Sequence, residues 1–229
     1  MNIPVIYEDD FLAVFDKPSG LLTIPAPGGR EKDLTGILNS QNIKQKLSFR
    51  FHPCHRLDRE TSGLIIYAKG KSAQKKIMDM FRDRMVKKTY LAVLHGYPGT
   101  VSGTIRWGIE GRPAVTSYEV LFKHPAFSVV RAYPQTGRTN QLRIHFTRAG
   151  NPIVGESRFI FRRDFVLRAK RVLLHAAELE FRHPCSGEPL SLRAPLPQDM
   201  RNFFLKHGVD PEQFAAGSGT RSQGKQGGG

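Results

Sequence analysis

The ten residues HRLDRETSGL (55–64) place an aspartate, Asp58, between two arginines and shortly before the apolar run LIIYA (64–68). Hydroxyl residues and a glycine follow the aspartate, and these residue types favour a tight turn. The apolar run is rich in β-branched and aromatic residues, so we expect it to form a buried strand. A carboxylate on a turn before such a strand allows two interpretations. It forms a surface ion pair with its neighbours, or it is held ionised as a nucleophile.

The composition indicates a basic globular protein. The 229 residues include 35 Lys and Arg against 20 Asp and Glu, a formal net charge of +15. An excess of this size favours a polyanionic partner, most commonly nucleic acid, although a generally basic surface has the same composition. No apolar run is long enough to cross a bilayer. The start, MNIPVIYEDD, lacks the features of a secretory signal, and Cys54 and Cys185 do not make a disulfide framework, so we expect a cytoplasmic protein with no membrane partner.

Strand-like segments outnumber helical ones along the chain. Patterns typical of strands occur at 5–7, 11–15, 64–68, 89–96, 116–123, 127–134 and 172–181. Within 89–96 the alternation places Tyr90, Ala92 and Leu94 on one face of the strand. Most of the strands are joined by short turns, so we predict an α+β fold with a mainly antiparallel sheet flanked by helices.

Capping residues predict where two of the helices begin. Ser72 is expected to cap a helix that runs to about Met85. Thr139 is expected to cap a helix over 140–149 that ends at Gly150.

Five segments form an ordered set of motifs between about residues 3 and 200. They are KPSGL (17–21), HRLDRETSG (55–63), KKTYLAV (87–93), TGRTNQLRIH (136–145) and VLLHAAELEF (172–181). In this order they resemble the RluA family of RNA pseudouridine synthases. The resemblance implies the catalytic fold of that family with a central RNA-binding cleft. It also implies isomerisation of uridine to pseudouridine in structured RNA, with no metal and no redox cofactor.

The resemblance assigns roles to individual residues. Asp58 falls on the catalytic aspartate, and Tyr90 falls on the tyrosine that stacks against the target base. Arg143 falls on the arginine that pairs with the catalytic carboxylate, and Arg56 on the arginine that helps hold the place of the extruded nucleotide. Further substrate contacts are expected from His55, Thr61, Leu142 and Arg138.

The chemistry of Asp58 can be stated without the resemblance. Breaking a glycosidic bond builds positive character at C1′, which an ionised carboxylate stabilises or attacks, as in glycosidases. Uracil can carry negative charge as it leaves, so one carboxylate is enough. Burial raises the pKa of an aspartate and a nearby guanidinium opposes that rise. We expect Arg143, with its planar fork, to hold Asp58 ionised. An ion pair that only ties the turn to a helix is the alternative.

Other residues near the turn have simpler explanations. We expect His55 to be a hydrogen-bonded structural residue rather than a base. Thr61 and Ser62 are expected to bond to the backbone of the turn. His52, Cys54 and His55 lack the spacing of a common zinc site, so we expect no metal there.

The sequence departs from the family pattern in three places. Asn140 stands where the motif TGRTNQLRIH (136–145) usually has a histidine, Glu156 replaces an aspartate, and Phe159 replaces a nearby tyrosine. We expect these changes to alter fine contacts with RNA and to touch neither Asp58 nor Arg143.

We predict a catalytic domain at 1–214 and a disordered tail at 215–229, because the tail AAGSGTRSQGKQGGG lacks core-forming residues. Many members of the family carry a small RNA-binding domain ahead of the catalytic one. Here the catalytic motifs begin almost at once, so we expect that domain to be absent. The run FRRDFVLRAKR (161–171) interleaves aromatic and basic residues and is either a contact for the RNA backbone or a solvated face.

Three functions compete. The first is an RNA pseudouridine synthase that acts as a monomer on ribosomal RNA, transfer RNA or both. The second is a non-catalytic RNA-binding or RNA-folding protein on the same scaffold. The third is a glycoside hydrolase that uses Asp58, which requires a second carboxylate within reach. The presence of Asp58, Tyr90 and Arg143 together favours the first.

Overall fold

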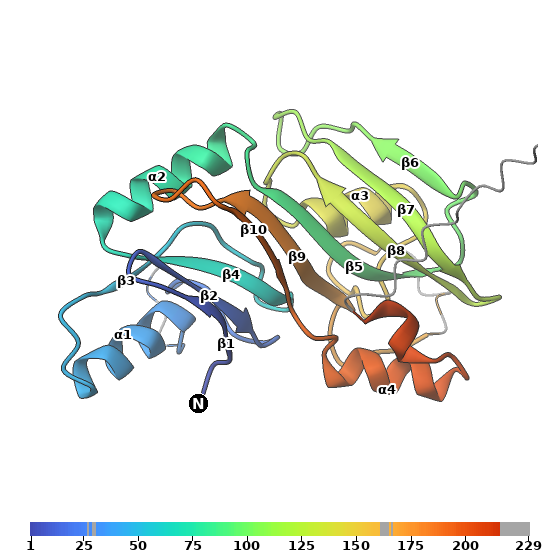
Figure 1. The fold of residues 1–229 in the computed structure, drawn as a ribbon. Coiled ribbons are helices and arrows are strands. Elements are labelled where there is room, and N and C mark those ends of the chain that lie inside the picture. Colours follow the sequence, from blue (N-terminus) through green and yellow to red (C-terminus); the bar gives the residue numbers. More distant parts are fainter. Residues whose placement is uncertain (27, 29–30, 161–164, 166, 216–229) are drawn as a thin grey trace, which may run out of the picture.

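A computed structural model describes residues 1–26, 28, 31–160, 165 and 167–215. In this part of the chain, ten strands form one sheet with the order β1-β2-β4-β9-β5-β8-β7-β6, while β3 pairs with β4 and β10 with β9 (Figure 1). The strands are β1 (Val5–Glu8), β2 (Leu12–Lys17), β3 (Phe51–Pro53), β4 (Ser62–Lys69), β5 (Lys87–His95), β6 (Ser102–Ile105), β7 (Thr116–Lys123), β8 (Phe127–Pro134), β9 (Leu174–Arg182) and β10 (Pro189–Arg193). The helices are α1 (Leu34–Lys44), α2 (Lys71–Arg82), α3 (Gln141–Arg148) and α4 (Gln198–Lys206), and a short 3₁₀ helix spans Pro211–Phe214.

The first half of the sheet is covered on both faces. Leu64 and Ile66 of β4 pack in the cluster that contains the apolar side of α2. The alternate residues Ile65 and Tyr67 pack with α1. A strand covered on both faces needs apolar residues at every position, which is why LIIYA is a continuous apolar run. The prediction of a buried strand here is confirmed.

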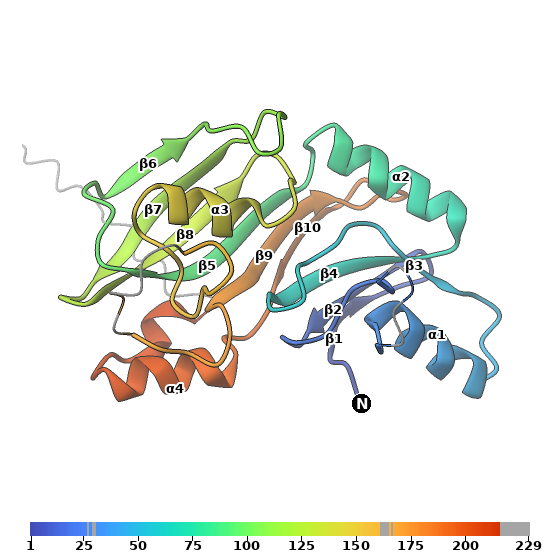
Figure 2. The ribbon, with the colours of Figure 1, turned by 180° about the vertical axis from the view of Figure 1, so that it is seen from behind.

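The second half of the sheet repeats this arrangement with α3 and α4. Ala92 and Leu94 of β5 pack with α3, together with half-buried Tyr90. Leu91 and Val93 point to the other face, where they pack with α4. Figure 2 shows α3 in front of the sheet formed by β5, β7 and β8. The predicted alternation in 89–96 is therefore confirmed, as is an α+β fold with a mainly antiparallel sheet flanked by helices.

The two halves meet at a short parallel pairing between β4 and β9. Ser62 pairs with His175 and Gly63 with Ala176. The Ser62 hydroxyl also lies 3.0 Å from Nδ1 of His175. Gly63 has a φ of +108°, and a Cβ at this position would overlap with the backbone of Ala176. Only glycine fits this close approach, so the end of the HRLDRETSG motif fixes how the halves join.

The predicted start and end of α2 are wrong. The helix begins after Gly70, and no side chain caps it. It ends at Arg82, because Arg84 adopts the left-handed conformation with a φ of +59°. Met85 lies beyond the helix and is 57% exposed. The apolar periodicity continued past the point where the backbone turns.

The predicted cap of α3 is also wrong, whereas its end is confirmed. Asn140, with a φ of +54°, is the residue before the helix, and its side chain makes no capping bond. The Gln141 side chain orders this turn instead, because its Oε1 accepts from the Arg138 amide at 3.0 Å. The helix stops before Gly150, whose φ is +85°.

No helix among the described residues is long and apolar enough to cross a membrane. Residues 161–164 and 166, within the basic aromatic run, and residues 216–229, in the predicted tail, lie outside the described part. The division into a domain at 1–214 and a tail stays a prediction.

Candidate active site

A cleft of about 530 Å³ lies where the two halves of the sheet meet. Its walls come from the turn at 55–61, the end of α2, the start of β5 and the segment 134–142. Its volume is within the range of about 300–1,000 Å³ that is usual for ligand sites. The cleft therefore brings together the second, third and fourth sequence motifs.

Nearly all the predicted site residues line this cleft. Asp58 and Tyr90 face it from opposite halves, and the remaining lining residues from the prediction are Arg56, His55, Thr61, Leu142 and Arg138. Arg143 is not among the lining residues and lies behind the wall, with 7% of its surface exposed.

The wall of the cleft carries more positive than negative side chains. Five cationic side chains line it: Arg56, Arg82, Arg84, Lys88 and Arg138. Among the described residues that line the cleft, Asp58 is the single carboxylate. The second carboxylate required by a glycoside hydrolase is therefore not found among them. No sequence prediction placed Arg82, Arg84 and Lys88, which lie at and after the end of α2, in the cleft.

Asp58 lies on a turn closed by a hydrogen bond from the Thr61 amide to the Asp58 carbonyl at 3.1 Å. Burial raises the pKa of the Asp58 carboxyl above its ordinary value, against the opposing charges of Arg143 and Arg56 and the nearby backbone amide of Asn140. The expectation that Ser62 bonds to the turn backbone is wrong, because its hydroxyl faces His175.

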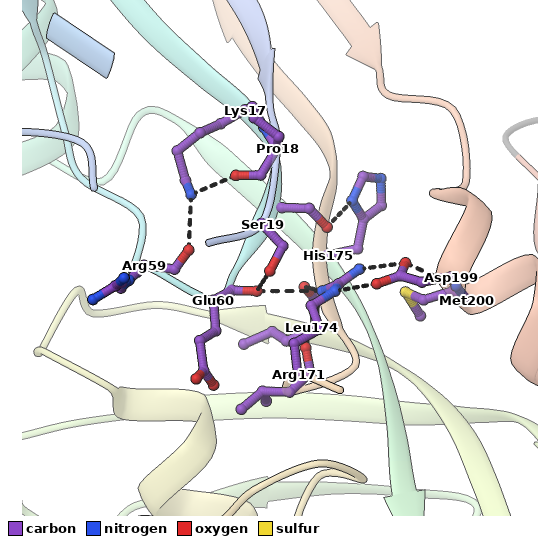
Figure 3. A network of polar contacts seen from close by, with 12 residues as sticks. Lys17, Pro18, Ser19, Arg59, Glu60, Arg171, Leu174, His175, Asp199 and Met200 are labelled. Carbon is purple, nitrogen blue, oxygen red and sulfur yellow. Dashed lines mark hydrogen bonds and ion pairs between the residues drawn. The ribbon is translucent and has the colours of Figure 1, made fainter. Parts of the chain in front are cut away.

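Two side chains from much earlier in the chain, those of Lys17 and Ser19, hold the backbone that follows Asp58 (Figure 3). The buried Lys17 ammonium donates to the carbonyl of Pro18 at 2.9 Å, to that of Leu21 at 2.8 Å and to that of Arg59 at 3.2 Å. The Ser19 hydroxyl donates to the Glu60 carbonyl at 2.8 Å. KPSGL therefore supports the turn, and burial lowers the pKa of Lys17 to about 7.

Arg171 approaches the same backbone from the other side (Figure 3). Its guanidinium forms a two-pronged ion pair with Asp199 of α4, at 2.5 and 2.9 Å. The remaining nitrogen donates to the carbonyls of Leu174 at 2.9 Å and of Glu60 at 3.3 Å. The turn that carries Asp58 is thus tied to α4 as well as to β2.

Arg143 does not have the partner predicted for it. Its Nε and Nη2 donate to the two carboxylate oxygens of Glu156, at 2.6 and 2.9 Å, and Nη1 donates to Oδ1 of Asn140 at 3.1 Å. The Phe159 ring lies 5.2 Å from the guanidinium carbon. Within the described residues, no ion pair of 4.0 Å or less joins Arg143 to Asp58.

The expectation that the three departures from the family pattern leave Arg143 untouched is therefore wrong. Asn140, Glu156 and Phe159 all contact it. No sequence signal distinguished Glu156 from the other acids as its partner. Arg143 nevertheless acts on Asp58 through its charge, as the strongest of the groups that oppose the raised pKa.

Burial determines the protonation states of Tyr90 and His55. Burial, together with the Asp58 charge, raises the pKa of the Tyr90 hydroxyl, so this group stays protonated at neutral pH. Nε2 of His55 accepts from the Ile66 amide at 3.0 Å, and the ring packs 4.5 Å from Phe81. Burial lowers the pKa of His55 to about 3, so it is a neutral acceptor that anchors the turn to β4. The described residues contain no group of three or more metal-ligating side chains.

Comparison with known proteins identifies the family. The family described as RNA pseudouridylate synthase matches residues 11–148, more than half of the chain.

The chain belongs to this family.

It is 35% identical to the dual-specificity RNA pseudouridine synthase RluA of Pasteurella multocida over 84% of this chain and 93% of that protein. It is 32% identical to the ribosomal large subunit pseudouridine synthase C of Vibrio vulnificus over 86% of this chain and 66% of that protein.

Solved structures agree with the fold. Human RNA pseudouridylate synthase domain containing 4 superposes with a TM-score of 0.72 at 24% identity, over 85% of this chain and 89% of that one. Human RNA pseudouridylate synthase domain containing 1 superposes with a TM-score of 0.68 at 26% identity, over 85% of this chain and 83% of that one. The predicted RluA-type family and the pseudouridine synthase fold are confirmed. The protein is an RNA pseudouridine synthase that isomerises uridine in RNA.

Proposed function

We propose that Asp58 is the nucleophile of this RNA pseudouridine synthase. The observation that carries the proposal is the composition of the cleft wall, where Asp58 is the one carboxylate among five cations in the described part of the chain. A carboxylate near C1′ promotes cleavage of a glycosidic bond, and cations bind the phosphates of an RNA backbone. Both kinds of group line this cleft.

The reaction conserves every atom of the nucleotide. The N1–C1′ bond breaks, the uracil turns, and a C5–C1′ bond forms. C5 then gives up its proton and N1 gains one, so no group is added or lost. A uracil inside a duplex cannot reach Asp58, so the target nucleotide is extruded into the cleft.

Tyr90 and Arg56 fit the tasks of holding the extruded nucleotide. Tyr90 is half-buried and lines the same cleft as Asp58, and its ring offers a flat surface for stacking on the uracil. Its hydroxyl is protonated at neutral pH and serves as a hydrogen-bond donor rather than a base. Arg56 lies two residues before Asp58 at the cleft wall, where it reaches the RNA stack or a phosphate.

The RNA partner is proposed to be structured ribosomal RNA, transfer RNA or both. The names of the relatives support this, because one is described as dual-specificity and another as acting on the ribosomal large subunit. We further propose that the protein acts as a monomer in the cytoplasm. Sequencing pseudouridine in cellular RNA with and without the gene identifies the modified position.

Release of tritium from C5-labelled uridine in RNA tests the role of Asp58. Asp58→Asn removes the charge and keeps the shape, so we expect turnover to fall by roughly 10³-fold or more while RNA affinity stays within about threefold. Asp10→Asn is the matched control, because Asp10 is an exposed aspartate on the β1–β2 turn. Normal turnover by Asp58→Asn would exclude Asp58 as the nucleophile.

Tyr90→Phe separates stacking from hydrogen bonding in the same assay. The variant keeps the ring and removes only the hydroxyl. Loss of turnover with retained RNA affinity assigns the hydroxyl to the reaction, whereas full activity would limit Tyr90 to stacking.

A further inference from the structure

The connection between β6 and β7, residues 106–115, folds back on itself as a small hairpin. Ile109 and Arg112 exchange two backbone hydrogen bonds, at 2.9 and 3.0 Å. Glu110 and Gly111, which lie between them, have φ values of +50° and +70°, as in a type I′ turn. The Ile109 side chain is buried. We call this element the 106–115 hairpin, and its backbone is fixed by its own hydrogen bonds.

Side chains of α3 and of the segment before it attach the hairpin to the body of the protein. Nε2 of His145 donates to the Trp107 carbonyl at 2.9 Å, and Nη1 of Arg148 donates to the carbonyl that follows it, also at 2.9 Å. Nε of Arg138 donates to the Pro113 carbonyl at 3.1 Å, and Arg138 lines the cleft. Figures 1 and 2 both show the β6–β7 connection facing the end of α2 at the top of the molecule. The hairpin therefore lies beside the cleft.

Trp107 places an exposed aromatic ring on this fixed backbone. It is the single tryptophan of the chain, and 47% of its surface is exposed. Within the described residues, the indole has no hydrogen-bond partner and no ring stacked on it. One exposed apolar side chain is common on a protein surface and needs no ligand to explain it. The charges around Trp107 are what indicate a binding role.

Arginines accompany Trp107 on the hairpin and on the segments that hold it. They are Arg106, Arg112, Arg138 and Arg148. In the described part of the chain, none of them forms an ion pair of 4.0 Å or less with a carboxylate. Glu110 is the one acid of the hairpin sequence. An aromatic ring among unpaired cations is typical of surfaces that bind unpaired nucleic acid, where the ring stacks on a base and the cations contact phosphates.

We propose that Trp107 stacks on an unpaired base of the substrate RNA that lies near the extruded uridine. In a continuous duplex the faces of the bases are covered by their neighbours, so an indole can stack only where a base is unpaired. The contact therefore directs the enzyme to uridines in loops and other unpaired segments. It selects RNA by shape rather than by sequence, because every base offers a face for stacking. The proposal rests on the action on structured RNA proposed above and is independent of the role of Asp58.

The fluorescence of Trp107 tests the contact in the unaltered protein, because all indole emission comes from this residue. Two probes are compared: an RNA hairpin whose loop contains an unpaired uridine, and a blunt RNA duplex of the same length in which the uridine is paired. A label on the RNA reports when binding is saturated. Stacking on a base quenches indole emission, so we expect emission to fall by roughly half with the hairpin and to change little with the duplex. Unchanged emission with the hairpin bound, or an equal fall with both probes, would overturn the proposal.

Variants of Trp107 measure what the contact contributes to binding and turnover. Trp107→Ala removes the ring, so we expect the Kd for the RNA hairpin to rise roughly fivefold or more. In tritium release from RNA of cells that lack the gene, the loss should lie mainly in KM rather than in kcat. Trp107→Phe keeps a ring and should recover most of the affinity. Trp107→Leu keeps an apolar side chain without a ring and should resemble Trp107→Ala. Equal affinities of the Phe and Leu variants would assign Trp107 to packing and refute stacking.

Phe11→Leu is the matched control. Phe11 is 43% exposed on the β1–β2 turn and is not among the residues that line the cleft. We expect its substitution to leave Kd and KM unchanged, and a rise equal to that of Trp107→Leu would contradict a specific contact at Trp107. An active Asp58→Asn would refute the nucleophile and leave the Trp107 contact standing, because the fluorescence measures binding alone.

Discussion

Gly63→Ala tests whether the close approach of β4 to β9 holds the two halves of the sheet together. A Cβ at this position would lie 2.7 Å from the Ala176 nitrogen and 2.8 Å from its carbonyl carbon, and would overlap its oxygen. These atoms belong to the backbone of a central strand and cannot rotate away. Ordinary contact requires separations near 3.5 Å, so the strands would have to part by roughly 1 Å.

The expected loss of stability has two sources. A residue other than glycine at this positive φ costs about 1–3 kcal/mol. Forced displacement of packed backbone costs about 1–3 kcal/mol more. The total of about 2–6 kcal/mol corresponds to a fall in melting temperature of roughly 5–20 °C in a chain of this size. Turnover should also fall, because the shift propagates to the turn that carries Asp58.

Gly99→Ala provides the control. Gly99 has a φ of +83°, but nothing lies within 4 Å of its ideal Cβ, so it retains the backbone strain without the overlap. Urea unfolding followed by circular dichroism measures both variants. If Gly63→Ala costs no more free energy of unfolding than Gly99→Ala, the close approach between the halves is not what requires glycine.

Two other predictions concern charge. The logarithm of RNA affinity should fall with the logarithm of salt concentration with a slope of roughly −3 to −4, because five cations line the cleft and each phosphate contact releases counterions; a flat response would contradict electrostatic binding there. Burial raises the pKa of Asp16 to about 6, so between about pH 4 and pH 6 the folded state binds a proton that the unfolded state has lost. This group therefore lowers stability as pH rises through that window. Asp16→Asn should raise the urea midpoint above that of the wild type by more at pH 7.5 than at pH 4.5. An equal gain at both pH values would contradict this account of Asp16.

Seven of the ten strands in the described part of the chain were predictable because each carries its own pattern, whereas the short strands β3 and β6 and the strand β10 were missed. The continuous apolar run of β4 follows from cover by α1 and α2, and the alternation in β5 follows from two separate clusters. The first residues of the helices were less predictable. Several neighbouring residues are of types that can cap a helix, and the sequence does not show at which of them the backbone enters the helix. Gly70 precedes α2 where Ser72 was expected, and α3 follows a left-handed Asn140.

The cleft residues were predictable from motifs, but their partners were not. Asp58, Tyr90 and Arg56 were placed by chain order, and the structure brings them to one cleft. The acid that holds Arg143, Glu156, lies just after Ile153, which forms a bridge with Leu94 of β5. This contact depends on the tertiary fold, so no local sequence pattern predicts it. The same holds for Arg171, whose partner Asp199 lies 28 residues away.

The buried position of Arg143 has a consequence for the bound complex. Arg56, Arg82, Arg84, Lys88 and Arg138 line the cleft, so RNA phosphates can reach and neutralise them. Arg143 is 7% exposed and held by Glu156, so phosphates cannot reach it, and its charge acts on Asp58 in the free and the bound enzyme alike.

Binding of RNA therefore removes part of the positive field that favours ionised Asp58, and the phosphates add negative charge near it. The pKa of Asp58, already raised by burial, should rise further in the complex. The acidic limb of kcat, which reports the complex, should lie at higher pH than that of kcat/KM, which reports the free enzyme. Steady-state tritium release between pH 4.5 and pH 8 measures both limbs. A kcat limb at the same or lower pH would show that the exposed cations do not control Asp58.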